Sequence, residues 1–173
     1  MESRGWPFCF IGGLAVIRWG EIRATRYSDL CILCGFGNEE KYIHGFLKRY
    51  QPRIPDAATF AQHNRVLLLY ADNKVLLDIS LSGLVFDEEM IRRASQYAYT
   101  PEISLITCSA EDLIILKAFA DRPKDWGDVE SFLARQKHHL DEDYIVNRLT
   151  PLCDLKEQPE IVAGLRKMLQ PLD

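Results

Sequence analysis

The stretch IGGLAVIRWGEIRATRYSDLCIL (residues 11–33) decides the fold prediction. An apolar strand leads into Gly12-Gly13, apolar residues at helical spacing follow, and a second strand then carries a single carboxylate, Asp29. Strand side chains alternate between the two faces of a sheet, so Tyr27 and Asp29 project from the same side. Because an unpaired charge within an apolar strand is unfavourable, Asp29 needs a cation, a hydrogen-bond network or exposure to a cleft.

The next part of the chain alternates between helices and strands. An amphipathic helix is expected at 39–50. Two apolar runs at 65–71 and 74–81 are separated by Asp-Asn, a common hairpin turn, which predicts antiparallel strands. The second run also holds one carboxylate, Asp78. Two further elements complete an α+β layer, namely a helix around 87–96 and a short strand around 102–108.

From Ser109 the pattern is helical only. This serine is a good N-cap, and acids follow it in the first helical turn. Three more helical segments follow at 124–137, 141–153 and 158–169, with Pro123, Pro151 and Pro159 near their boundaries. We therefore predict an α+β protein in which residues 1–108 form a small mixed-sheet core and residues 109–173 form a helical bundle.

Length and composition exclude several classes of protein. The 173 residues suffice for one ordinary core with a helical extension, and the formal charge of −4 argues against gripping nucleic acid through the whole surface. No apolar run approaches the roughly 18 residues of a membrane span, and the N-terminus lacks the layout of a secretory leader. The odd number of cysteines, five, favours reduced thiols and a cytoplasmic protein. The CxxC pair Cys31 and Cys34 overlaps an apolar strand, which favours small buried residues over a zinc site.

A shared metal ion would compensate both strand carboxylates at once. Mg²⁺ prefers oxygen ligands and commonly uses one or two protein carboxylates, while substrate phosphates and waters complete its coordination. Asp29 and Asp78 on neighbouring strands would supply such a pair. The glycine turn ahead of them would let phosphate oxygens approach backbone amides at a helix N-terminus.

The same residues carry a family resemblance. IGGLAVIRWGEIRATRYSDLCIL resembles the signature of polymerase β-like nucleotidyltransferases, in which a Gly-Gly or Gly-Ser turn precedes a D-x-D strand and a third aspartate on another strand. The longer match, with ATRYSDL, KVLLDISL and SAEDLIILKAFADRPKDWGDVE, is similar to the AbiEii-type nucleotidyltransferases of toxin-antitoxin and phage-resistance systems. The resemblance covers nearly the whole chain and implies that the helical region completes a nucleotide cleft.

The resemblance implies a reaction and a set of site residues. The family transfers a nucleoside monophosphate from an NTP to an acceptor and releases pyrophosphate. Gly12 and Gly13 match the glycines that hold the nucleotide phosphates, and Asp29 and Asp78 match catalytic carboxylates that bind Mg²⁺. The alternative for each aspartate is an ordinary strand residue whose charge is satisfied within the protein.

The resemblance extends into the helical region. Lys117 matches a catalytic lysine that contacts the triphosphate, and the motif RPKDWGD matches a terminal motif of the family through Arg122, Asp125 and Asp128. The resemblance implies that Arg122 and Asp125 help to bind the nucleotide. Two alternatives stay open from the residues themselves. Lys117 borders the apolar face of its helix, so its stem could lie on the core with the ammonium in solvent, and the motif could be a charged helix junction with intrahelical pairs.

Tyr27 departs from the family pattern, which has aspartate at this position. A neutral phenol is a poor ligand for a hard cation, and the ring would occupy metal or substrate space. We therefore expect weakened Mg²⁺ binding and nucleotidyl transfer, with nucleotide binding retained through the glycine turn and Lys117. The alternative is a catalytically inactive protein that binds a nucleotide or a partner, and a pure scaffold is disfavoured because it leaves both aspartates unexplained. Natural loss, changed chemistry and an engineered substitution all fit the tyrosine.

The partners implied are a nucleoside triphosphate, an acceptor and a cognate protein. The acceptor could be a tRNA end, a protein side chain or a small molecule, and no membrane is implied. The first strand lies close to the start of the chain, so a helix that relatives place there would be missing. Its absence would expose apolar surface and favour a homodimer.

Overall fold

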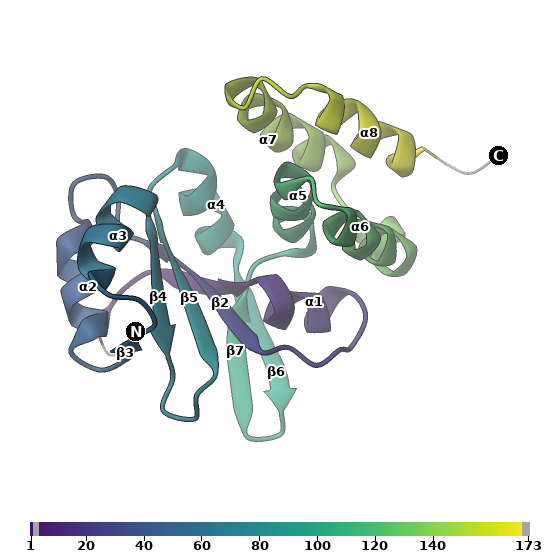
Figure 1. Ribbon diagram of the computed structural model, residues 1–173. Helices are drawn as coiled ribbons and strands as arrows, with labels where there is room; N and C mark the ends of the chain where they lie inside the picture. Colours follow the sequence, from purple (N-terminus) through teal and green to yellow (C-terminus); the bar gives the residue numbers. More distant parts are fainter. Residues whose placement is uncertain (2–3, 171–173) are drawn as a thin grey trace. The chain divides into compact units, whose positions relative to one another are not determined.

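The computed structural model describes Met1 and residues 4–170, and the chain divides into two compact units. The first unit, here called the sheet unit, comprises residues 1–15 and 23–108. The second, the helical unit, comprises 16–22 and 109–173. Figure 1 follows the elements in chain order. Helix α1 (Gly12–Trp19) begins in the sheet unit and ends in the helical unit, so the division falls within a continuous helix.

The sheet unit is built on a mixed sheet. The described residues form seven strands in the order β3-β4-β5-β2-β1-β7-β6. Strand β2 is parallel to β5 and antiparallel to β1, and β1 is parallel to β7. The pairs β3–β4, β4–β5 and β6–β7 are antiparallel. The strands are β1 (Phe8–Ile11), β2 (Tyr27–Leu33), β3 (Gln51–Pro52), β4 (Val66–Tyr70), β5 (Leu76–Ser82), β6 (Ser95–Thr100) and β7 (Ile103–Thr107).

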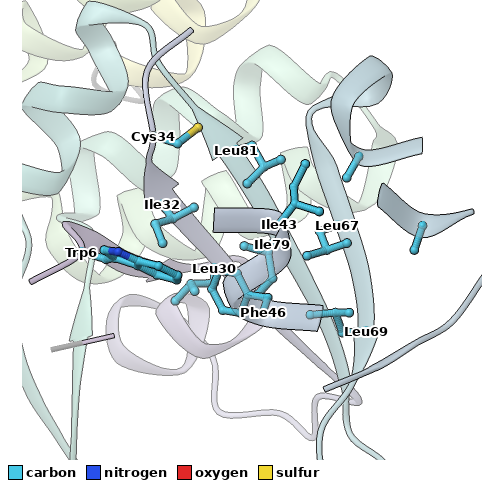
Figure 2. Close-up of a cluster of buried hydrophobic side chains, with 12 residues drawn as sticks. Trp6, Leu30, Ile32, Cys34, Ile43, Phe46, Leu67, Leu69, Ile79 and Leu81 are labelled. Carbon is cyan, nitrogen blue, oxygen red and sulfur yellow. The ribbon is translucent and has the colours of Figure 1, made fainter. Parts of the chain in front are cut away.

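One face of this sheet is apolar. Helices α2 (Glu39–Leu47) and α3 (Ala57–Asn64) contribute to its core, and α4 (Val85–Arg93) follows β5 in the chain. Leu30 and Ile32 of β2 and Ile79 and Leu81 of β5 alternate along their strands and belong to this core, so their side chains are almost fully removed from water. Figure 2 shows the strand residues Leu30, Ile32, Ile79 and Leu81 gathered with Ile43, Phe46 and Trp6. The alternate positions of the same strands therefore face the other side of the sheet.

The helical unit consists of segment 16–22 and the helices that follow Ser109. The Ser109 hydroxyl accepts a hydrogen bond from the Asp112 N–H at 3.1 Å, which confirms the expected N-cap. A Cβ at Gly20 would lie 2.6 Å from the Phe132 ring, so the segment packs closely on α6. The helices are α5 (Ala110–Ala120), α6 (Pro123–Gln136), α7 (Glu142–Leu155) and α8 (Glu160–Leu169), with a 3-10 turn at Lys137–His139.

All five cysteines are buried, and none of them forms a disulfide bond. Four of them, Cys9, Cys31, Cys34 and Cys108, lie in the sheet unit, and Cys153 lies in the helical unit. The prediction that the CxxC pair consists of buried apolar residues is therefore confirmed. No helix within the described residues has the length and apolar character needed to cross a bilayer.

The mixed α+β fold and the antiparallel hairpin of β4 and β5 are confirmed, while two local predictions are wrong and one helix was missed. The helix expected at 87–96 ends at Arg93, because the residues from Ser95 onward pair with β7. Segment 57–64 forms a helix that was not predicted. Pro151 lies inside α7 and does not interrupt it, since buried residues on both sides keep the helix packed and outweigh one lost hydrogen bond.

Candidate functional site

Asp29 and Asp78 lie side by side on the face of the sheet opposite the α2–α3 core. Asp29 of β2 is in register with Asp78 of β5, and these two strands are parallel neighbours. Paired residues on neighbouring strands project to the same face, and neighbouring strands are about 4.8 Å apart. The residues that follow them, Leu30 and Ile79, point into the core. The sheet therefore brings together the two carboxylates that the sequence singled out.

The glycine turn packs directly against one of these carboxylates. Gly12 has a φ of +54°, and a Cβ on this residue would lie 2.1 Å from Oδ2 of Asp29. The Gly13 N–H points at the same oxygen, with the nitrogen 3.4 Å away. A side chain at position 12 is therefore excluded by both space and backbone conformation. The N-terminus of α1, where the helix dipole favours negative charge, is held against Asp29.

Asp78 is ion-paired with Arg53, which the sequence analysis did not identify. Arg53 Nη2 lies 2.8 Å from Oδ1 of Asp78, and the two side chains are 14% and 28% exposed. The oxygen makes no well-directed hydrogen bond to any described residue, so the contact is mainly electrostatic. Backbone pairing brings the two side chains together. The Arg53 N–H donates to the carbonyl oxygen of Leu68, and Leu68 is in register with Asp78.

Arg53, Leu68, Asp78 and Asp29 thus form one row across four neighbouring segments. The arginine is hard to find in sequence because β3 spans only two residues and carries no alternating pattern. The one sequence feature that pointed to Arg53 was its position as a basic residue directly after the short edge strand β3.

Tyr27 occupies the first position of β2, two residues before Asp29 and in register with Leu76. Its side chain is 47% exposed, and its backbone is held by Thr25, whose hydroxyl donates to the Tyr27 carbonyl at 2.9 Å. Position 27 therefore lies on the same face as Asp29, as the strand alternation predicts. It offers a phenol and not a carboxylate to this face.

The helical unit gathers Lys117, Arg122, Asp125 and Asp128 into a second cluster. Lys117 Nζ lies 2.7 Å from Oδ1 of Asp125 and 2.8 Å from Oδ2 of Asp128, and its side chain is only 11% exposed. Arg122 binds the other oxygen of Asp125. Burial alone would raise the pKa of Asp125, but hydrogen bonds from Arg122 and Lys117 outweigh burial and lower it. The ammonium is therefore neutralised by two buried carboxylates that link α5 to α6.

A third buried acid of the helical unit was also missed by the sequence analysis. Asp112 is fully buried; its Oδ1 accepts a hydrogen bond from the Tyr144 hydroxyl at 2.7 Å, and its Oδ2 accepts one from the Ser109 hydroxyl at 2.8 Å. Asp112 stands in the first turn of α5, where acids are common on solvated helices, so nothing in the sequence separated it from Glu111.

The residues predicted from the sequence therefore fall into two groups. Gly12, Gly13, Asp29 and Asp78 are brought together in the sheet unit. Lys117, Arg122, Asp125 and Asp128 are brought together in the helical unit. All residues of each group lie within one unit.

The carboxylate pair fits a single Mg²⁺ ion. Among the described residues no group of three or more His, Cys, Asp and Glu side chains could share a metal, so the protein would supply two carboxylates. Such a pair is a common protein contribution to Mg²⁺, whose other ligands are waters and phosphates. Oδ1 of Asp78 has a cation beside it but no directed hydrogen bond, which leaves this oxygen suited to coordination.

Comparison with known proteins identifies the fold. No family model and no curated protein matches the sequence. Among solved structures, the chain is similar to the lincosamide antibiotic adenylyltransferase LnuA in its lincomycin-bound form, with a TM-score of 0.51 and 15% identity, over 76% of this chain and 88% of LnuA. It is also similar to an antigenic nucleotidyltransferase-like protein from Paracoccidioides brasiliensis, with a TM-score of 0.50 and 12% identity, over 95% of this chain and 86% of the other. A third similar structure is the antibiotic-resistance factor ANT(2'')-Ia, with a TM-score of 0.44, 18% identity, and coverage of 96% and 83%.

Proposed function

On a nucleotidyltransferase fold, we propose that this protein binds a nucleoside triphosphate with Mg²⁺ and transfers its nucleoside monophosphate slowly to an acceptor. The observation that carries the proposal is the in-register pair Asp29–Asp78 beside the glycine turn. Two carboxylates on one face, next to a helix N-terminus with no side chain at its first residue, supply oxygen ligands and backbone donors within one small area.

Asp29 and Asp78 would hold the metal ion in this proposal. Bound there, Mg²⁺ would neutralise phosphate charge and orient the leaving pyrophosphate. Gly12 and Gly13 would let phosphate oxygens approach the backbone at the start of α1, where the helix dipole favours negative charge. The chain's own contribution would be positioning and electrostatic stabilisation.

Tyr27 is the reason for proposing slow transfer. Its phenol stands on the carboxylate face and cannot supply the charge that a second metal ion would need. A second candidate function, nucleotide or partner binding without turnover, is favoured by the ion pair of Asp78 with Arg53, because a protein cation already compensates that carboxylate.

Several finer assignments are part of the proposal. The AbiEii-type assignment and a cognate protein partner rest on the sequence resemblance. The acceptor stays a tRNA end, a protein side chain or a small molecule, and the lincomycin bound by LnuA supports including small molecules in an acceptor screen. The five buried cysteines, none of them in a disulfide bond, favour a reducing, cytoplasmic location. A triphosphate contact for Lys117 would require phosphate to compete with Asp125 and Asp128 for its ammonium.

The test is calorimetric binding of the four NTPs in the presence of Mg²⁺, with pyrophosphate release followed in parallel. The wild-type chain is compared with Tyr27→Asp, which restores the carboxylate of the family pattern. Tyr99→Asp is the matched control, because Tyr99 is a strand tyrosine with similar exposure, 41% against 47%, on the edge strand β6. We expect wild-type binding with slow release, and faster release from Tyr27→Asp alone.

The outcomes separate the two candidate functions. Binding without release in either form would favour the binding protein over the enzyme. Fast release by the wild-type chain would show that Tyr27 does not impair transfer. Failure of every NTP to bind to either form would remove the nucleotide site altogether.

A further inference from the structure

Arg53 places a positive charge on the carboxylate pair before any metal ion arrives. Its guanidinium lies 2.8 Å from Asp78, and only 14% of its side chain is exposed. The neighbouring pair Arg49–Asp72 shows the ordinary alternative, since both of its side chains are more than half exposed. Solvent screens an exposed pair strongly and a more buried one less, so the Arg53 charge acts on its carboxylate with less screening than the Arg49 charge does.

The need for this charge follows from the strand register. Asp29 and Asp78 stand directly opposite each other on strands about 4.8 Å apart, so two carboxylates repel across the ladder. The N-terminus of α1 and the Gly13 N–H favour the charge on Asp29. The guanidinium of Arg53 lies against Asp78. The pair is therefore compensated by the protein itself, without an added ion.

A divalent cation would compete with Arg53 for the carboxylate of Asp78. The guanidinium contacts Oδ1 of Asp78, the same oxygen that lacks a directed hydrogen bond and is suited to coordination. A cation bound between Asp29 and Asp78 would also stand close to the guanidinium, and like charges within a few ångströms oppose each other strongly where water is scarce.

We propose that Arg53 is a built-in counter-ion of the Asp29–Asp78 pair, which leaves Asp78 when a divalent cation binds and thereby sets the metal concentration at which the site fills. The inference rests on the proposed function for its metal site. It adds a residue that determines metal affinity and comes from the segment after β3, outside the strands that carry the carboxylates.

The experiment measures Mn²⁺ binding by electron paramagnetic resonance, using the full chain without nucleotide. The main variant is Arg53→Gln, whose side-chain amide is neutral but can still donate a hydrogen bond to Asp78. Arg53→Lys keeps the charge, and Arg49→Gln removes the exposed arginine nearby. We expect Arg53→Gln to bind Mn²⁺ about tenfold more tightly than wild type, which corresponds to about 1.4 kcal/mol. Both other variants should stay within about threefold of wild type, because a charge at Arg49 is screened.

A second measurement uses the wild-type chain and does not depend on the folding of any variant. The NMR signal of the Arg53 Nε–Hε group is followed during a Mg²⁺ titration, together with the backbone amides of Asp29 and Asp78. We expect all three to change at the same Mg²⁺ concentration. A guanidinium signal that stays fixed while the strand amides respond would overturn the inference, as would equal Mn²⁺ affinity for wild type and Arg53→Gln.

Nucleotide binding separates this inference from the proposed function. Tighter Mn²⁺ binding by Arg53→Gln with no NTP binding by any form would support the counter-ion and refute the nucleotide site. NTP binding by wild type with no gain in metal affinity in Arg53→Gln would refute the counter-ion and leave the proposed function standing. If no form binds a divalent cation, the inference is refuted together with the metal site.

Discussion

Replacing Lys117 by methionine is expected to lower the free energy of unfolding by about 3 kcal/mol. The substitution keeps most of the apolar stem and removes the ammonium that lies 2.7 Å from Asp125 and 2.8 Å from Asp128. Asp125 keeps its contact with Arg122, whereas Asp128 loses a cation in a position that is nearly closed to water. Most of the lost stability should therefore come from the lost contact with Asp128.

The size of the effect follows from burial. Removing one partner of a buried ion pair costs about 3 to 5 kcal/mol, because the remaining charge is left uncompensated. We take the lower end, since Arg122 still serves Asp125. A loss of about 3 kcal/mol is a large part of the roughly 5 to 15 kcal/mol that stabilises a typical domain. Arg122→Met should cost less than about 1 kcal/mol, because that side chain is 59% exposed and its pair is screened.

Urea unfolding followed by circular dichroism at 222 nm measures both variants, since helices dominate that signal. The double variant Lys117→Met with Asp128→Asn also removes the carboxylate charge that Lys117 compensates in the wild type, and it should recover about 1 to 2 kcal/mol of the loss. A loss below about 1 kcal/mol for Lys117→Met alone would refute the reasoning, because it would show that the ammonium does not compensate buried carboxylates.

Three further predictions concern single contacts. Gly12→Ala should destabilise the sheet unit by about 2 kcal/mol or more and abolish Mn²⁺ binding. The reason is that Gly12 has a positive φ and that the new Cβ would displace the Asp29 carboxylate. A stable variant with normal Mn²⁺ binding would contradict this. Since the pKa of Asp125 is lowered in the folded state, the stability it contributes is fully present above its unfolded value of about 3.9 and is lost as the pH falls below that value. Urea unfolding of wild type and Asp125→Asn between about pH 3 and 7 should therefore show a difference that shrinks only below about pH 4, and a constant difference would oppose the assignment. Tyr144→Phe should cost about 1.5 to 3 kcal/mol in the same unfolding assay, because it removes a hydrogen bond to buried Asp112, and a neutral effect would argue that the acid is satisfied without it.

The elements that the sequence predicted well are those with strong local periodicity. Alternation predicted that Tyr27 and Asp29 lie on the same face of their strand, and the Asp-Asn turn predicted the antiparallel pairing of β4 with β5. Ser109 was predicted as an N-cap from its hydroxyl and the acids that follow it. In each case the local structure is determined by interactions among a few residues that are close in sequence.

The parts that were missed depend on contacts between distant segments. Arg53 reaches Asp78 only because a two-residue strand pairs with β4, and such a strand has no period to detect. Ser95 and its successors form an edge strand because β7 is there to pair with them. The burial of Lys117 between two acids required the packing of α6 on α5, whereas its position on the helix allowed a solvated ammonium equally well.

The buried cysteines provide a way to watch the two units open separately. Four thiols belong to the sheet unit, while Cys153 alone reports on the helical unit, and burial raises the pKa of both Cys34 and Cys153. Since the thiolate is the form that reacts with alkylating reagents, each thiol should be labelled only when its surroundings open. Mass spectrometry of alkylated peptides would then give opening free energies for each unit in the unmodified chain, without introducing any probe.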